Sequence, residues 1–189
     1  SNFNELIDTY AEEEYKEKWK VSIQDGSVTF GSAKDKWAIN VDIMKKKGVT
    51  FKDVIDAYSD SGKVEDLVEK APLAEGVLGM VVKHHPPPHV AQKYRIPKIW
   101  KGDLDSDIGK SLLNCDDNGP TIMMIVNMTI DPAAGPVAIG RLFSGTIKDG
   151  QTINIIDTKR EGRVQSVNFF MSNVREQVGE LSAGNIPAL

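Results

Sequence analysis

The stretch TIMMIVNMTIDPAAGPVAIGRLFSGTIKDGQTINIID, residues 121–157, decides the fold of the second half of the chain. Residues 121–130 are rich in Ile, Val, Met and Thr and carry little charge, which predicts a strand covered on most of its surface. Two prolines and a glycine in residues 131–136 then predict a loop, because proline removes a ladder donor and glycine permits a reversal. From Val137 onward apolar residues alternate with small ones, which indicates a second, half-buried strand.

Turn signals in the same half predict a small antiparallel barrel. Gly140 and Gly145, inside the second strand, predict bends or bulges of the kind that a sheet needs when it curls. The Asp149-Gly150 pair predicts a hairpin whose returning strand is residues 152–156. The remaining predicted elements are a charged hairpin tip at residues 159–163 and strands at residues 164–170, 177–181 and 186–189. About six short strands at this spacing are typical of a small closed barrel.

The first half of the chain is predicted to be mostly helical. Apolar residues at helical spacing predict an amphipathic helix over residues 4–18, and a short strand follows at residues 27–30. Gly48 is a helix stop signal, and Thr50 opens a capping-box pattern. The other predicted helices are residues 42–47, one that opens at Thr50, residues 64–70, and one that starts at Leu73 and ends at the prolines 86–88. Those prolines are the first candidate domain boundary.

Composition narrows the class of protein. The 189 residues are 40% hydrophobic, enough to bury a core, and the formal charge of −4 argues against a self-sufficient nucleic-acid binder. A single cysteine, Cys115, excludes an internal disulfide and fits a reducing compartment. No apolar run approaches a membrane span, and no signal peptide is visible. We therefore expect a cytoplasmic protein without a membrane partner.

Two apparent motifs fail on inspection. Gly109-Lys110-Ser111 resembles the end of a phosphate-binding loop, but Leu104 stands where that motif requires glycine. We therefore expect residues 89–115 to form an extended connector instead. Three histidines beside the proline run lack an acidic or cysteine ligand at metal-site spacing, so no metal is expected. They are His84, His85 and His89.

Three segments resemble one family. GRLFSGTIKDGQTI (residues 140–153) resembles the second-domain β-barrel of the translational GTPases. FGSAKDKWAI (residues 30–39) and AQKYRIPKIWKGDLDSDIGKSLLNCD (residues 91–116) narrow the resemblance to the archaeal and eukaryotic type of elongation factor 2. The similarity extends over nearly the whole chain in the same order, and it implies an internal fragment of that family.

The resemblance implies a fold class and domain limits. It implies an α+β, mostly helical remnant of a P-loop GTPase domain, followed by an all-β domain II barrel. Residues 1–88 would be the C-terminal part of the GTPase domain, residues 89–115 a connector, and residues 116–189 a domain II truncated at its C-terminus. The parent would be a GTPase that moves transfer RNA and messenger RNA through the ribosome. It would use GTP or GDP with magnesium.

The fragment itself should hold no cofactor and no catalytic residue, because the P-loop, the magnesium-coordinating switch and the NKxD motif are absent from it. The resemblance assigns a guanine-contact loop to Gly31, Ser32 and Ala33, where a backbone N–H would face O6 of the base and small residues let the main chain approach. The alternative is an ordinary turn in which Ser32 caps the next helix.

The barrel would rest on RNA of the small ribosomal subunit, and no DNA partner is expected. The five cations that are candidates for RNA contact are Arg141, Lys148, Lys159, Arg160 and Arg163. Their alternative role is that of solvated hairpin ends, because exposed lysine and arginine are common on surfaces. A second function stays open, namely that the barrel holds the aminoacyl end of transfer RNA, as in the factors that deliver it.

Overall fold

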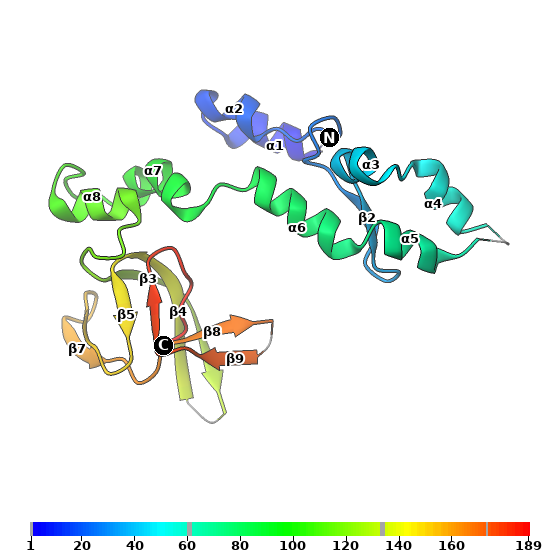
Figure 1. The fold of residues 1–189 in the computed structure, drawn as a ribbon. Coiled ribbons are helices and arrows are strands. Elements are labelled where there is room, and N and C mark those ends of the chain that lie inside the picture. Colours follow the sequence, from blue (N-terminus) through cyan, green and yellow to red (C-terminus); the bar gives the residue numbers. More distant parts are fainter. Residues whose placement is uncertain (1, 60–61, 133–134, 173) are drawn as a thin grey trace. The chain divides into compact units, whose positions relative to one another are not determined.

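The computed structural model describes residues 2–59, 62–132, 135–172 and 174–189, and Figure 1 shows its ribbon. The chain divides into two compact units, Ser1–His85 and Pro86–Leu189, and each is described by itself. A helical first half and a strand-rich second half are confirmed. None of the helices in the described ranges is long and apolar enough to span a bilayer.

The first unit surrounds one short buried strand. The strand β2 (Trp37–Ile39) is buried at all three residues and contacts the helices α3, α5 and α6. Its other edge receives the segment before α6, where the Ala38 N–H donates to the Ala71 carbonyl at 3.0 Å. The other elements of this unit are α1 (Asn2–Tyr10), α2 (Glu13–Trp19), β1 (Phe30–Ser32), α3 (Val41–Lys47), α4 (Phe51–Ala57), α5 (Val64–Lys70) and α6 (Leu73–His84).

The stop and start signals in the first unit are confirmed. Gly48 ends α3 in the left-handed conformation, with φ of 68°. Thr50 and Asp53 form the predicted capping box at the start of α4. These signals are local, because each satisfies backbone groups within one turn of the helix.

Two predictions for the first unit are wrong. The single helix over residues 4–18 is two helices, and Glu12 between them is extended, with ψ of 148°. Neither helix has a buried residue, so no core packing keeps the two segments in one continuous helix. The Asn4 side chain instead forms hydrogen bonds of 2.9 and 3.0 Å with the backbone of Val21. The strand predicted at residues 27–30 begins at Phe30, where it can pair with β2, which the sequence analysis did not identify.

The connector predicted as extended over residues 89–115 is helical. It contains α7 (Pro88–Ile99) and α8 (Asp107–Asn114). Ser106 caps α8 by accepting from the Gly109 N–H at 3.1 Å, and Cys115 ends that helix with φ of 55°. Ile96 of α7 and Leu112 of α8 are buried in the same cluster, and this packing stabilises both helices. The prolines and aspartates of the segment had hidden its amphipathic pattern in the sequence.

The second unit continues with antiparallel strand pairs. The pairs are β3 with β4, β5 with β10, β6 with β7, and β8 with β9. Residues 185–189 lie beside β4, where Ala138 and Leu189 exchange two backbone hydrogen bonds. The pairings among the described residues do not close into a ring. The strands are β3 (Ile122–Asp131), β4 (Gly135–Ser144), β5 (Thr146–Lys148), β6 (Thr152–Ile155), β7 (Arg160–Arg163), β8 (Asn168–Met171), β9 (Val174–Gln177) and β10 (Glu180–Ser182).

The bends predicted inside the second strand are confirmed. Gly145, with φ of 77°, separates β4 from β5. At Gly140 an added Cβ would lie 2.2 Å from the Met124 carbonyl oxygen, and the register of β3 against β4 shifts beside it, between Ile125 and Asn127. A glycine is therefore needed where the two strands bulge.

The predicted pairing of residues 152–156 with the strand before them is wrong. The turn itself forms, since the Gln151 N–H donates to the Lys148 carbonyl at 3.2 Å and Gly150 has φ of 75°. However, two N–H groups of the turn donate to carbonyls of other segments. The Asp149 N–H donates to the Gly179 carbonyl and the Gly150 N–H to the Val164 carbonyl, each at 2.8 Å. The two strands therefore diverge to different partners.

Four further strand predictions need correction. The prediction that β3 is covered on most of its surface is wrong, because its side chains from Met124 to Met128 are largely exposed. The strand pairs with β4 along one edge. The charged hairpin tip at residues 159–163 is mostly strand β7, and the turn precedes it. The strands predicted at residues 164–170 and 177–181 begin at Asn168 and Glu180 instead.

Candidate functional site

The predicted guanine-contact loop lies at the tip of the β1–β2 hairpin. Gly31 and Ser32 are the last residues of β1, opposite Ala38 and Trp37 of β2. Ala33 is the first residue of the turn that follows, and it is exposed. The hairpin therefore carries all three predicted residues on consecutive positions at one end.

Gly31 is required by the hairpin itself. A Cβ added there would lie 2.6 Å from the carbonyl oxygen of Trp37 and 3.1 Å from Cα of Ala38, which is too close for any side chain. The family resemblance implies a small residue here because a base approaches the main chain. The structure supplies a packing reason that holds without any ligand.

Ser32 does not cap the next helix. Its hydroxyl accepts from the Asp35 N–H at 3.1 Å and donates to Oδ2 of Asp35 at 2.9 Å, so it is committed to the turn. The cap of α3 is Asn40, whose Oδ1 accepts from the Ile43 N–H at 3.0 Å. The alternative prediction, that Ser32 caps the next helix, is therefore wrong.

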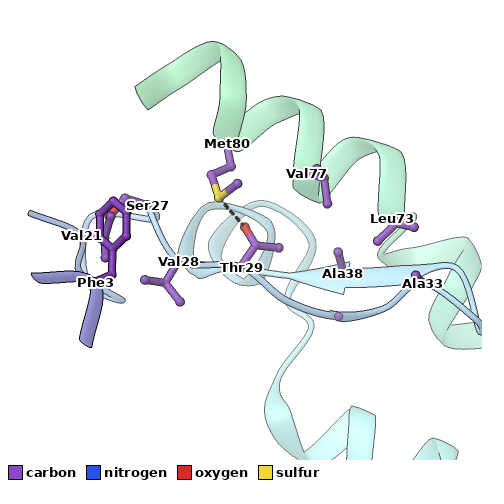
Figure 2. Close-up of a pocket in the computed structure, with 11 residues that line it drawn as sticks. Phe3, Val21, Ser27, Val28, Thr29, Ala33, Ala38, Leu73, Val77 and Met80 are labelled. Carbon is purple, nitrogen blue, oxygen red and sulfur yellow. Dashed lines mark hydrogen bonds between the residues drawn. The ribbon is translucent and has the colours of Figure 1, made fainter. Parts of the chain in front are cut away.

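An apolar pocket of about 510 Å³ adjoins the hairpin, between β1 and α6 (Figure 2). Leu73, Val77 and Met80 line it from α6, and Gly31 and Ala33 line it from the hairpin. The side chains that line it include no cation. The pocket therefore does not suit a triphosphate.

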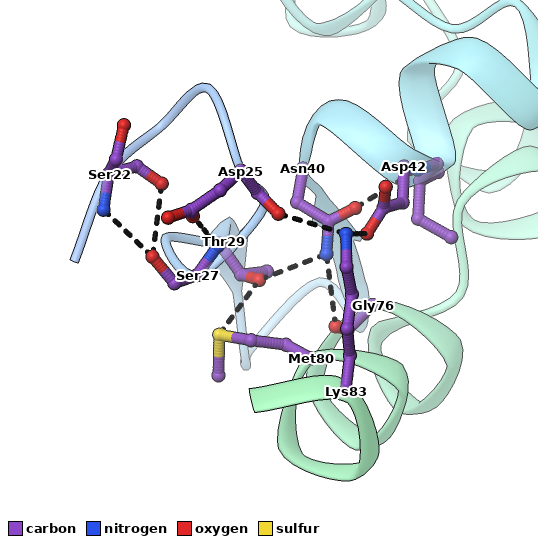
Figure 3. Close-up of polar contacts among 10 residues, drawn as sticks. Ser22, Asp25, Ser27, Thr29, Asn40, Asp42, Gly76, Met80 and Lys83 are labelled. Atoms are coloured by element: carbon purple, nitrogen blue, oxygen red, sulfur yellow. Dashed lines mark hydrogen bonds and ion pairs between the residues drawn. The ribbon is translucent and has the colours of Figure 1, made fainter. Parts of the chain in front are cut away.

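A polar cluster ties the entry to β1 to the helices α3 and α6 (Figure 3). Asn40 is 4% exposed, and its Nδ2 donates to Oγ1 of Thr29 at 3.2 Å and to the Gly76 carbonyl at 3.3 Å. Lys83 of α6 bonds the Asp25 carbonyl at 2.9 Å and Oδ2 of Asp42 at 2.7 Å. These contacts hold the segment from Asp25 to Thr29, which leads into the β1–β2 hairpin, against α3 and α6.

The hairpin tip has small residues at Gly31, Ser32 and Ala33. The guanine contact expected there requires small residues, because a backbone N–H has to approach O6 of the base. Within the described residues, no three metal-ligating side chains come together.

The five predicted RNA-contact cations divide into two groups. Arg160 and Arg163 belong to β7, and Lys159 lies in the turn just before it, with φ of 52°. Arg163 also donates from Nε to the Gly150 carbonyl at 3.2 Å. The other two cations are on different strands, since Arg141 lies half-buried in β4 and Lys148 of β5 forms an ion pair of 2.9 Å with Glu180.

Two residues near the hairpin, Asn40 and Tyr58, were not predicted from the sequence to have a role there. Asn40 directly precedes α3, so the preference of asparagine for helix N-caps could have identified its capping role. Its bonds to Thr29 and Gly76 had no sequence signal, because they join residues that are distant in the chain. The same holds for Tyr58, which reaches residues more than twenty positions away.

Comparisons with known proteins give two findings. The family model of elongation factor Tu domain 2 matches residues 135–189. All 189 residues align with elongation factor 2 of Cenarchaeum symbiosum at 82% identity, and they cover 26% of that protein. The matches to elongation factor 2 of Sulfurisphaera tokodaii and Sulfolobus acidocaldarius are 54% and 49% identical over 98% of this chain and 25% of each relative. The chain thus spans about a quarter of the length of the curated relatives it matches.

Proposed function

Over its whole length the chain is the counterpart of one segment of elongation factor 2, and from this premise we propose that it works within a translation factor that moves transfer RNA and messenger RNA through the ribosome. The observation that carries the proposal is the 82% identity across all 189 residues. Identity of this extent reaches both units, so it supports a shared role for the helical unit and for the strand-rich unit.

We assign the helical unit to nucleotide recognition. Residues 1–88 are the C-terminal part of a GTPase domain, and Gly31, Ser32 and Ala33 contact the guanine base through the main chain. GTP with magnesium drives the factor's cycle when it is bound to the full-length protein. This chain alone contributes the base contact and is inactive as a GTPase, because the phosphate-binding motifs lie outside its sequence.

We assign the strand-rich unit to ribosome docking. Residues 89–115 form the connector that leads from the GTPase part into the strands, and residues 116–189 belong to a domain II that closes as a barrel in the full-length protein. Its cations bind RNA of the small ribosomal subunit in the cytoplasm. The grouping of Lys159, Arg160 and Arg163 at one hairpin supports this assignment, because neighbouring cations act together on phosphates.

Calorimetry tests the nucleotide proposal. The full-length protein that contains this sequence should bind GDP and reject ADP, and the 189-residue chain should give no heat with GTP. Replacing Ala33 by proline removes the N–H of that residue, so guanine selectivity should fall while the fold is retained. Tight nucleotide binding by the 189-residue chain, or equal binding of GDP and ADP by the full-length protein, would contradict the proposal.

A pull-down separates the two possible roles of the barrel. The full-length protein should retain ribosomes, and a translocation assay should depend on GTP. Preferential retention of charged transfer RNA would instead favour the delivery role, to which the match with elongation factor Tu domain 2 over residues 135–189 also gives weight.

A further inference from the structure

A chain of side-chain hydrogen bonds runs from the guanine-contact hairpin to the end of α4. It begins at Ser32, whose hydroxyl donates to Oδ2 of Asp35 at 2.9 Å. The hydroxyl of Tyr58, the C-cap residue of α4, donates to the same Oδ2 atom. One carboxylate oxygen therefore receives two hydroxyl donors, one from the hairpin and one from a residue 23 positions away.

Tyr58 is itself held in place by β2. The indole Nε1 of Trp37 donates to the Tyr58 hydroxyl oxygen at 2.8 Å, and the two rings meet edge to face with centroids 6.4 Å apart. Trp37 is only 8% exposed and belongs to the core of the first unit. The Tyr58 hydroxyl thus accepts from a buried residue of the core and donates to a residue of the turn.

The electrostatics of the turn agree with this arrangement. Hydrogen bonds from Tyr58 and then from Ser32 hold the pKa of Asp35 below its ordinary value of 3.8. The carboxylate is therefore ionised at neutral pH, and charge-assisted bonds of this kind are stronger than those between neutral groups. Tyr58 is 52% exposed and does not belong to the buried core of the first unit.

We propose that Tyr58 is a positioning residue for guanine selectivity, because it fixes Asp35 and through it the turn that follows Gly31 and Ser32. The proposal rests on the assignment of this hairpin to the guanine base. It extends that assignment to a residue on a different element. It also links base recognition to α4, since the end of that helix supplies one of the two hydroxyl donors to Asp35.

The test removes the hydroxyl of Tyr58 and keeps its aromatic ring. Tyr58→Phe in the 189-residue chain should speed amide hydrogen exchange at Asp35 about tenfold and shift the indole N–H resonance of Trp37. In the full-length protein the same variant should lower the ratio of GDP to ADP affinity by about tenfold. The matched control is Tyr10→Phe, which alters an exposed tyrosine of the same unit and should change neither readout.

A double-mutant cycle separates positioning from general stability. If Tyr58 acts through Asp35, Tyr58→Phe should have no further effect on selectivity once Asp35→Ala is present. Additive effects, or an unchanged affinity ratio in Tyr58→Phe, would overturn the inference. If the unaltered full-length protein fails to distinguish GDP from ADP, the guanine assignment itself is overturned, which is a different result from a selective protein that is indifferent to Tyr58.

Discussion

Leu142 and Phe143 are neighbours in β4, yet their side chains lie in two different hydrophobic cores. Leu142 is fully buried with Ile147, Val164 and Val167 among the strands. Phe143 points to the opposite face and packs with residues of α7 and α8. This end of β4 is therefore covered on both faces, whereas the sequence pattern predicted a strand buried on one face.

Truncating the two side chains should damage different parts of the second unit. Leu142→Ala should lower the free energy of unfolding by about 2–5 kcal/mol, and Phe143→Ala by about 3–5 kcal/mol, because each leaves a cavity. Native-state amide hydrogen exchange should show the first loss among the strands and the second in α7 and α8. Ile156→Ala, at a residue 85% exposed, is the control with little effect. Identical patterns for both variants would mean that the two cores unfold as one.

Gln92 should be intolerant of an apolar replacement. Its Nε2 donates to the carbonyls of Leu112 at 2.5 Å and Phe143 at 2.9 Å, in a site where Gln92 is 2% exposed. Gln92→Met keeps the volume but leaves two buried carbonyls without a donor, so stability should fall by about 1–3 kcal/mol in urea unfolding. Gln165→Met, at an exposed site of the same unit, is the matched control, and an equal loss there would contradict the account.

The amide of Asn40 should matter more than its shape. Asn40→Ala removes the α3 cap, at a cost of about 0.5–2 kcal/mol, and also the donor to the Gly76 carbonyl. Asn40→Asp keeps the cap but turns a donor into an acceptor that faces Gly76 and Thr29. We therefore expect the aspartate variant to be less stable than the native chain and to lose more as pH rises and the carboxyl ionises. Thermal unfolding at two pH values would show it, and an aspartate variant as stable as the native chain would refute it.

Acid should weaken the contact between α3 and α6 through Glu75. Hydrogen bonds from Lys47 and then Lys46 hold the pKa of Glu75 below its ordinary value of 4.5. A lowered folded-state pKa means that the stabilisation is present above the unfolded value and is lost as pH falls through the folded value. Glu75→Gln should therefore flatten the decline of stability below about pH 4.5. An unchanged acid limb in that variant, measured by denaturant unfolding across pH, would exclude this contribution.

Charge reversal on β7 should weaken ribosome binding by the full-length protein. Arg160→Glu with Arg163→Glu should reduce the affinity by about tenfold or more and flatten its dependence on salt, because fewer phosphate contacts would release fewer counterions. Lys110→Glu, an exposed cation on α8, is the control. Circular dichroism must show that the sheet persists, since Arg163 also bonds the Gly150 carbonyl. Unaltered binding with an intact sheet would remove β7 from the proposed interface.

Short-range sequence signals determined part of the structure and could be read from the sequence alone. The capping box at Thr50, the stop at Gly48, and the bends at Gly140 and Gly145 were predictable, because each depends on backbone groups within a few residues or on the conformational range of glycine. The position of the proposed guanine-contact residues at a strand end was close to that observed, although two of them lie within β1.

Strand partners and buried polar contacts were decided only by the tertiary structure. The Asp149-Gly150 turn forms as predicted, but its N–H groups donate to Gly179 and Val164, so the strands on either side separate. The Tyr58 hydroxyl donates to Asp35, which is 23 positions away, and no local sequence pattern predicts this hydrogen bond. The physical reason is that a turn or a cap satisfies its own hydrogen bonds within one segment, whereas a strand edge or a buried amide must find donors and acceptors wherever the packed chain brings them.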